Sequence, residues 1–394
     1  MSDLLAGMKT KWHGREAFTI HNDLVQLVSL LGGGHVAEFR FLENTGASTL
    51  NPLWVPPWKT IEPYRYRPEV HAARYGPPAT GRLISGIVGH NICLDYFGLP
   101  SEEEAAQGLS VHGEAPSAKW QKTKLHATSR EVALTLAVRL PVAGLRFRRE
   151  IRLRRGESVA YFAETVVNER KADHFFHWTQ HVTLAPPFLG RETSRVTIPA
   201  TKGRTYPLGY DGKPLLPPSR DFRWPFAPTL TGGKVDLTRT FVHAGRGFVA
   251  SVLLNPRRET AFVAALNGPH RLLIGYCFRR QDFPWVAIWE ENRSRTAPPW
   301  SRRSQTRGLE FGSTPFPVVR RDAFALAPLF GVPTFSMVPA RMEKTVHYLS
   351  FLAQVPPGFG EVRDIRLAGN EIQVQGSGLR SPLCVPATGL ADAA

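Results

Sequence analysis

The stretch FFHWTQHVTL, residues 175–184, carries two histidines and two threonines at alternate positions. Side chains two residues apart in a strand lie on the same face, so a strand here has one polar face made of His177, Thr179, His181 and Thr183. The opposite face is apolar except for Gln180. His177 and His181 would lie about 13 Å apart, too far to chelate one metal ion. We therefore predict no metal site and a stripe that suits a hydroxyl-rich ligand, with two ordinary surface histidines as the alternative.

Strands with one wet face are the commonest pattern around this stretch. In LRFRREIRLRRG, residues 145–156, apolar and charged residues alternate with one exception, Arg149. Residues 131–140 and 158–170 behave similarly, which predicts an antiparallel meander. Residues 101–109, SEEEAAQGL, predict one short helix with Ser101 as the N-cap. Residues 51–80 and 207–230 are predicted to be long loops that line or cover a ligand site.

The composition supports a folded chain with a large core. The 394 residues are 42% hydrophobic, and three widely spaced cysteines suggest neither a disulfide framework nor a thiolate metal site. The net charge of +16 comes from short groups of arginines, as in residues 301–307, without a basic tail or a base-stacking pattern. We therefore predict no nucleic-acid partner. The apolar run 24–31 is too short to span a membrane, so we predict no membrane partner and a cytoplasmic location.

Four segments in chain order carry a resemblance to a known family. They are NDLVQLVSLLGGGHVAEFRF (22–41), HGEAPSAKW (112–120), ETVVNERKADHFFHWTQHVTL (164–184) and TRGLEFGSTPFP (306–317). Together, over about residues 18–340, they resemble the galactose mutarotase-like superfamily, the aldose 1-epimerases and their relatives. The resemblance implies an all-β fold, a large antiparallel β-sandwich with few short helices. We expect one domain over residues 1–394, with its core at about 18–350 and a flexible tail at 385–394.

The family's chemistry suits the residue types in these segments. Mutarotation needs a base that takes the proton of the anomeric hydroxyl and an acid that protonates the ring oxygen. The resemblance implies that Glu310 is the base, that His181 is the acid and that His112 hydrogen-bonds a ring or hydroxyl oxygen. It implies no cofactor and no metal. His177 is a candidate sugar contact, since it shares the predicted face of His181.

Aromatic side chains are candidate platforms for the apolar face of a sugar, although tryptophans in β-sandwiches are more often core residues. The candidates are Trp120, Trp285 and Trp289.

The segment SVHGEAPSAKW, residues 110–120, is expected to present His112 to the pocket. Gly113 would let the backbone turn without a Cβ penalty, and a proline at 116 would keep the loop out of a β-ladder. Glu114 and Lys119 are then candidate ligand contacts, while Trp120 anchors the return into a strand. The alternative is an ordinary loop with a capping histidine.

The sequence departs from the aldose 1-epimerase pattern in three of these segments. Those enzymes commonly carry an Arg shortly after the His-Gly pair, where this chain has residues 115–117, APS, and their second His lies in an Asn-His-x-Tyr-Phe context. After Glu310, residues 311–316, FGSTPF, differ from the usual polar continuation. The identity of the sugar therefore stays open. Glu290 and Glu291 compete with Glu310 for the role of base, and we favour Glu310 because its apolar strand context would raise a carboxyl pKa.

The predicted function is that of a carbohydrate epimerase that interconverts the anomers of a small sugar. A non-catalytic carbohydrate-binding protein is the first alternative, because one fold hosts several tasks. A lyase or hydrolase that acts on an anionic saccharide is the second, although we identify no paired carboxylates for it. The arginines leave open an anionic or phosphorylated sugar as ligand. Monomer and homodimer are both compatible with the sequence.

Overall fold

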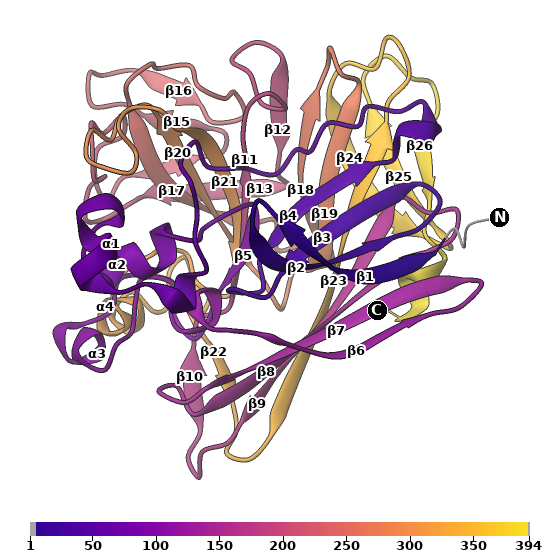
Figure 1. The fold of residues 1–394 in the computed structure, drawn as a ribbon. Helices are drawn as coiled ribbons and strands as arrows, with labels where there is room; N and C mark the ends of the chain where they lie inside the picture. The colour runs from indigo at the N-terminus through magenta and orange to yellow at the C-terminus, as the bar shows by residue number, and fades with distance from the viewer. Residues whose placement is uncertain (1–4, 393–394) are drawn as a thin grey trace.

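Two large antiparallel sheets pack face to face in the computed structural model, which describes residues 5–392 (Figure 1). Across these residues, the larger sheet has 13 strands in the order β1 (Ala6–Trp12), β2 (Arg15–His21), β3 (Val25–Leu30), β4 (Val36–Phe41), β5 (His90–Cys93), β11 (Thr179–Leu184), β21 (Gln305–Gly312), β20 (Trp285–Asn292), β17 (Gly247–Leu254), β13 (Ala200–Thr205), β14 (Asp221–Arg223), β15 (Phe226–Pro228) and β16 (Lys234–Asp236). Over the same residues, the second sheet has eight strands, β12 (Ser194–Thr197), β18 (Thr260–Asn267), β19 (Leu272–Arg279), β23 (Glu343–Gln354), β9 (Val159–Asn168), β8 (Leu145–Arg154), β7 (Glu131–Leu140) and β6 (Gln121–Ala127). The predicted all-β sandwich is confirmed.

The predicted meander is formed by β7, β8 and β9, which pair in sequence. Along β8 the apolar side chains are buried and Arg146 and Arg148 are exposed, as the alternation predicts. The apolar side chains enter the largest core cluster, where Phe147 of β8 joins Val182 and Leu309 of the other sheet. Arg149 breaks the pattern because it is buried with the apolar residues.

A buried polar network between the sheets explains both exceptions to the sequence patterns, Arg149 and Gln180. The carboxylate of Glu164, on β9, accepts hydrogen bonds from Arg149 Nε at 2.7 Å and Tyr348 Oη at 2.8 Å. Its second oxygen accepts from Trp178 Nε1 at 3.0 Å and Gln180 Nε2 at 2.6 Å. The two exceptions, Arg149 and Gln180, therefore share one buried carboxylate as their partner, as burial of polar groups requires.

The stretch 175–184 was expected as one strand, and the structure corrects this to two. β10 (His174–Phe176) pairs with β22 (Ser336–Val338) in a separate two-stranded sheet, whereas β11 begins at Thr179. At the break, the backbone N–H of His177 donates to the Asp95 carbonyl and that of Trp178 donates to Ser313 Oγ. Because these amides bond outside a ladder, the chain changes partner there, and His177 does not continue the face of His181.

Short helices gather at one side of the sandwich, at the left in Figure 1, beside β5, β17 and β20. This group consists of α1 (Pro68–Tyr75), α2 (Pro78–Ile84), α3 (Glu102–Ala106), α4 (Arg320–Ala325) and the 3₁₀ turns η2 (Pro63–Arg65) and η3 (Ala115–Ser117). The 3₁₀ turn η1 (Glu43–Thr45) follows β4 and lies apart from this group. The helix expected at 101–109 is confirmed as α3, and the Ser101 side chain accepts from the Glu104 amide. The loop expected at 51–80 instead holds α1 and the start of α2, and both helices begin with a proline, a favoured first helical residue. The loop expected at 207–230 contains β14 and β15.

The C-terminal segment packs on the outer side of the second sheet as β24 (Val362–Ala368), β25 (Glu371–Gly376), β26 (Leu383–Pro386) and η4 (Thr388–Asp392). The backbone N–H of Thr388 donates to Glu157 Oε1 at 2.9 Å, and Leu390 lies in the apolar cluster of this layer. Residues 385–390 are therefore packed against the sheet, where a flexible tail was expected, and residues 393–394 lie outside the described part. Within residues 5–392 no helix is long and apolar enough to cross a membrane.

Candidate active site

The strand register brings His181 and Glu310 together on one face of the larger sheet. His181 of β11 lies directly opposite Glu310 of β21 and, on its other side, opposite Asn91 of β5. Directly paired residues project to the same face. His181 Nε2 lies 3.2 Å from Glu310 Oε1, and His181 Nδ1 lies 3.1 Å from Thr183 Oγ1. The structure therefore joins the acid and the base that the resemblance implies.

The space for the Glu310 carboxylate depends on Gly308, two residues earlier on β21. A Cβ built on Gly308 would lie 2.2 Å from Glu310 Oε1 and 3.2 Å from Trp289 Cβ. A side chain at 308 would therefore displace the carboxylate from its place beside His181.

His112 lies beside this pair, as expected for the third catalytic candidate. Its ring centroid is 4.9 Å from that of His181, and its Nδ1 donates to the Phe97 carbonyl at 2.6 Å. In the neutral ring this leaves Nε2 as an acceptor. His112 is partly exposed whereas His181 and Glu310 are buried, so a ligand that comes from solvent reaches His112 first.

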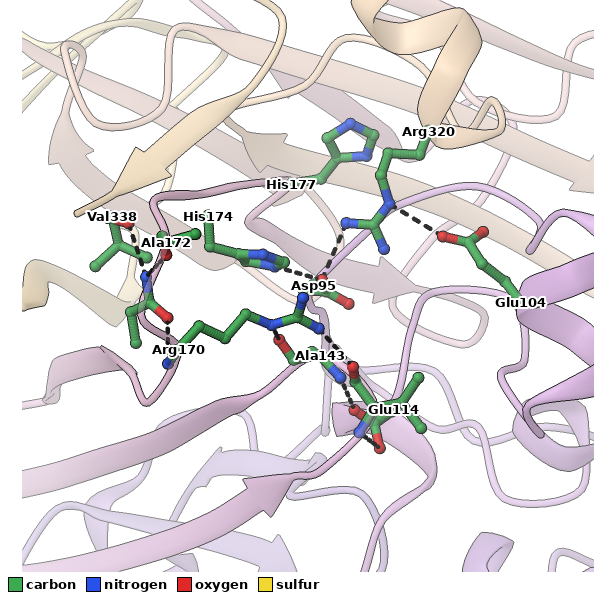
Figure 2. A network of polar contacts seen from close by, with 12 residues as sticks. Asp95, Glu104, Glu114, Ala143, Arg170, Ala172, His174, His177, Arg320 and Val338 are labelled. Atoms are coloured by element: carbon green, nitrogen blue, oxygen red, sulfur yellow. Dashed lines mark hydrogen bonds and ion pairs between the residues drawn. The ribbon is translucent and has the colours of Figure 1, made fainter. Parts of the chain in front are cut away.

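A polar network anchors the segment on which His112 rests (Figure 2). Asp95 Oδ2 accepts from His174 Nε2 at 2.7 Å and from Arg320 Nη1 at 3.0 Å, and Arg320 Nε also donates to Glu104 at 3.0 Å. Burial alone would raise the pKa of Asp95, but the hydrogen bond from His174 and the charge of Arg320 hold it below its ordinary value. The ionised Asp95 thus ties α3, α4 and β10 to the segment that carries Phe97.

Left-handed backbone at the His-Gly pair turns His112 toward the site. His112 has φ 69° and Gly113 has φ 83°, and a Cβ on Gly113 would lie 2.3 Å from the Leu94 carbonyl oxygen. We expect Gly113→Ala to lower the free energy of unfolding by about 2–4 kcal/mol, since an unfavourable conformation and overpacking add. Urea denaturation measures this.

Gly108→Ala is the matched control for that variant. Gly108 has φ 88°, but its Cβ would meet no atom within 4 Å. The control should lose only the backbone contribution, about 1 kcal/mol. Equal losses in the two variants would contradict a role for close packing at Gly113.

The structure does not bring His177 and Glu114 into this cluster. His177 is fully buried at the strand break, where its Nδ1 accepts from the Phe97 amide at 3.1 Å. Burial, with a smaller contribution from Arg320, lowers the pKa of His177 to about 3. The Glu114 carboxylate accepts from the backbone amides of residues 142 and 143, so it caps the turn between β7 and β8 (Figure 2).

Lys119 and two of the three candidate tryptophans also lie elsewhere. Lys119 is exposed, with its Nζ 5.5 Å from the centre of the Tyr64 ring. Trp120 is a fully buried core residue whose Nε1 donates to the Ala115 carbonyl. Trp285 is fully buried in another apolar cluster. A ligand at His181 would therefore touch none of these three side chains in the arrangement seen here.

Trp289 is the candidate platform that does reach the cluster. It lies on the same face as Glu310, and its ring centroid is 5.9 Å from that of His181. It belongs to a buried aromatic group with Trp54, Trp58 and Trp300, which covers this face from residues 51–84 and the 293–304 loop.

Neither alternative base is available to His181. Glu290 projects to the opposite face of β20, where Arg307 and the Phe241 amide bond its carboxylate. Glu291 shares the face of Glu310, but its carboxylate accepts from Tyr210 Oη and from Ser294. The geometry therefore favours Glu310 over Glu290 and Glu291 as the candidate base.

Asn91 is a site residue that sequence reasoning missed, and it lies near Thr179, a member of the predicted polar face. Both are fully buried, next to His181 and on its face. Neither the Asn91 carboxamide nor Thr179 Oγ1 has a hydrogen-bond partner among the described residues. Buried polar groups rarely lack a hydrogen-bond partner, so these two side chains are suited to bind the hydroxyl groups of a ligand. The short strand 90–93, HNIC, carries no motif that marks Asn91.

Burial shifts the pKa values of the three central residues toward their neutral forms. It raises the pKa of Glu310 well above its ordinary value of 4.5. It lowers the pKa of His181, which the neighbouring His112 ring lowers further, and it lowers that of His112 to about 4. Strongly shifted groups in one cluster are typical of acid/base sites. Among residues 5–392, no group of three or more His, Cys, Asp or Glu side chains is arranged to hold a metal ion.

Comparisons with known proteins rest on the fold. No family model and no curated protein sequence matches the chain. A candidate aldose 1-epimerase from Klebsiella pneumoniae superimposes with a TM-score of 0.61 at 13% identity, covering 88% of this chain and 83% of that chain. A galactose mutarotase-like protein from Clostridium acetobutylicum gives 0.60 at 11%, covering 89% and 99%. A TPR-domain containing protein from Parabacteroides distasonis gives 0.53 at 10%, covering 90% and 50%. The resemblance seen in the sequence is confirmed at the level of architecture: the chain has the galactose mutarotase-like fold.

Proposed function

We propose that this protein is a sugar epimerase of the mutarotase kind, which interconverts the anomers of an aldose by general acid/base catalysis. The observation that carries the proposal is the pairing of His181 Nε2 with Glu310 Oε1 at 3.2 Å on one sheet face. The anomeric hydroxyl and the ring oxygen of an aldose are bonded to the same carbon. The base and the acid must therefore stand side by side, as these two groups do.

One proton shared by the pair suffices for the cycle. Glu310, as carboxylate, takes the proton of the anomeric hydroxyl while His181, as imidazolium, protonates the ring oxygen. The bond between the anomeric carbon and the ring oxygen breaks, and an aldehyde forms. After the aldehyde rotates, the hydroxyl adds back and both protons return. The reactive charged pair differs from the neutral pair only by transfer of one proton between Glu310 and His181.

Neighbouring groups support a sugar as the ligand. His112 Nε2 is an acceptor for a sugar hydroxyl, and the carboxamide of Asn91 offers both a donor and an acceptor. Trp289 offers a ring face close to His181.

Anomer interconversion measured by NMR exchange tests the proposal. The substrate panel contains neutral aldoses, phosphorylated aldoses and uronic acids, each with and without the protein. We expect acceleration of at least one class. A folded protein that accelerates none of them would overturn the enzyme assignment and leave carbohydrate binding as the function to test.

A further inference from the structure

A cleft to which neither His181 nor Glu310 contributes lies between the β1–β2 turn and the segment 59–71. It encloses about 730 Å³, a size typical of small-ligand sites. Its lining includes Arg15, Lys59, Glu62, Tyr64, Arg65 and Tyr66. None of the residues assigned above to catalysis contributes to it.

The lining holds four lysine and arginine side chains, of which Arg15 lies beside Glu62 and Arg67 lies 3.8 Å from Glu69. Glu62 is buried, its Oε1 accepts from the Glu16 amide at 2.7 Å, and its Oε2 lies 3.6 Å from Arg15 Nε. Lys59 and Arg65 are exposed and have no carboxylate within ion-pair distance among residues 5–392. The cleft therefore presents positive charge that the described part of the protein does not neutralise.

The floor of the cleft is fixed by buried contacts. Arg15, only 2% exposed, donates to the carbonyls of Gly86 at 2.7 Å and Gly32 at 3.0 Å. With the bond from Glu16 to Glu62, these contacts join the β1–β2 hairpin to the segment 59–66 and to the turn at 86. The backbone that carries the cationic side chains of the rim is thus held in place before a ligand binds, which reduces the entropy lost on binding.

The aromatic residues of the cleft argue against single-stranded nucleic acid, which needs exposed rings on which bases stack. Of the two tyrosines in the lining, Tyr66 is buried with its hydroxyl donating to the Gly76 carbonyl, and Tyr64 is partly exposed. The other rings are the imidazoles of His13 and His71, which are smaller stacking surfaces than tyrosine or tryptophan rings. An extended ligand with regularly spaced carboxylates meets the cations without stacking.

The chain that lines the cleft also covers the candidate active site. Trp54 and Trp58 pack in the aromatic group of Trp289, and the next residue, Lys59, faces the cleft. We propose that this cleft binds the uronate units of an anionic oligosaccharide. The choice of a saccharide as ligand rests on the proposed function, whereas the choice of an anionic one rests on the charge of the cleft. The cleft would hold the distal, charged part of a chain while the active site handles a sugar end.

Calorimetric titration with an oligogalacturonate tests this proposal, with the double variant Lys59→Gln/Arg65→Gln against wild type. We expect wild type to bind at low salt and the double variant to bind at least about tenfold more weakly, because two charged contacts are lost. The matched control is Arg223→Gln/Lys234→Gln, which removes the same charge from exposed positions near the opposite edge of the larger sheet. The control should bind as wild type does.

Three results would overturn the proposal: no binding by wild type, equal weakening in both double variants, or equally tight binding of a neutral malto-oligosaccharide or an oligothymidylate. Anomer interconversion of a neutral monosaccharide is measured on the same variants and should not change. A failed cleft with intact catalysis, or the reverse, therefore separates this proposal from the proposed function.

Discussion

Replacement of Glu310 by glutamine is expected to lower the rate of anomer interconversion by about 10²–10⁴-fold, the usual contribution of a general base. Glutamine has nearly the same shape and keeps the contacts to His181 and Gly308, but it cannot take a proton from the anomeric hydroxyl. NMR exchange on the best substrate of the panel measures the effect. His181→Asn should cause a loss of similar size, since the two residues act as one unit.

The same variant should be more stable than wild type at neutral pH. Burial raises the folded-state pKa of Glu310 above 4.5, so the unfolded chain loses this proton at lower pH than the folded chain does. The folded state therefore loses stability as pH rises from about 4.5 through the raised pKa. Below about pH 4.5 the carboxyl is protonated in both the folded and the unfolded state, and the difference in stability between wild type and variant vanishes. Glu310→Gln should then unfold at higher urea concentration at neutral pH and match wild type in acid.

Glu291→Gln is the control that separates the two carboxylates on this face. Glu291 accepts hydrogen bonds from Tyr210 and Ser294, so its variant should lose stability at neutral pH rather than gain it. It should keep most of the interconversion activity of the folded protein. Activity that survives in Glu310→Gln but disappears in Glu291→Gln would reassign the base.

The fold was predictable because local alternation and burial agree along most strands. Residues 145–154 show the pattern at every position except Arg149, which is paired with Glu164 in the core. Gln180, the exception in the other strand, points to the same carboxylate. The helices at 68–84 were missed, although prolines stand at their first positions, because the frequent prolines and aromatics of this stretch look like those of a loop.

The candidate site was predictable only in part, because its members come from distant strands. The resemblance supplied His112, His181 and Glu310, and the register of β11 with β21 places the last two together. The direction of a loop side chain depends on partners that sequence spacing does not reveal. Glu114 follows His112 by two residues, yet it turns to the amides of residues 142 and 143. Asn91 could not be predicted from the sequence, because only the pairing of β5 with β11 brings it next to His181.

Glu164→Ala is expected to lower the free energy of unfolding by about 3–5 kcal/mol, as removal of one partner from a buried ion pair does. The Arg149 guanidinium and Glu164 are both fully buried and lie 2.7 Å apart. The change leaves that charge without its carboxylate and leaves the donors of Trp178 and Gln180 without an acceptor. The Tyr348 hydroxyl loses one of its two acceptors and keeps Gln180 Oε1 at 3.2 Å. Urea denaturation at neutral pH measures the loss.

Two further variants show whether the loss arises from the buried charge. Glu169→Ala removes the carboxylate of an ion pair with Arg139, whose side chain is 77% exposed, and it should change stability by less than about 1 kcal/mol. The double variant Arg149→Met/Glu164→Gln removes the charge and keeps an amide for the other donors, so it should recover much of the stability lost in Glu164→Ala. If Glu164→Ala lost no more than Glu169→Ala, the network would not be what holds β11 against β9. The position of His181, which follows Trp178 and Gln180 along the chain, would then have to depend on the ladders of β11 with β21 and β5 alone.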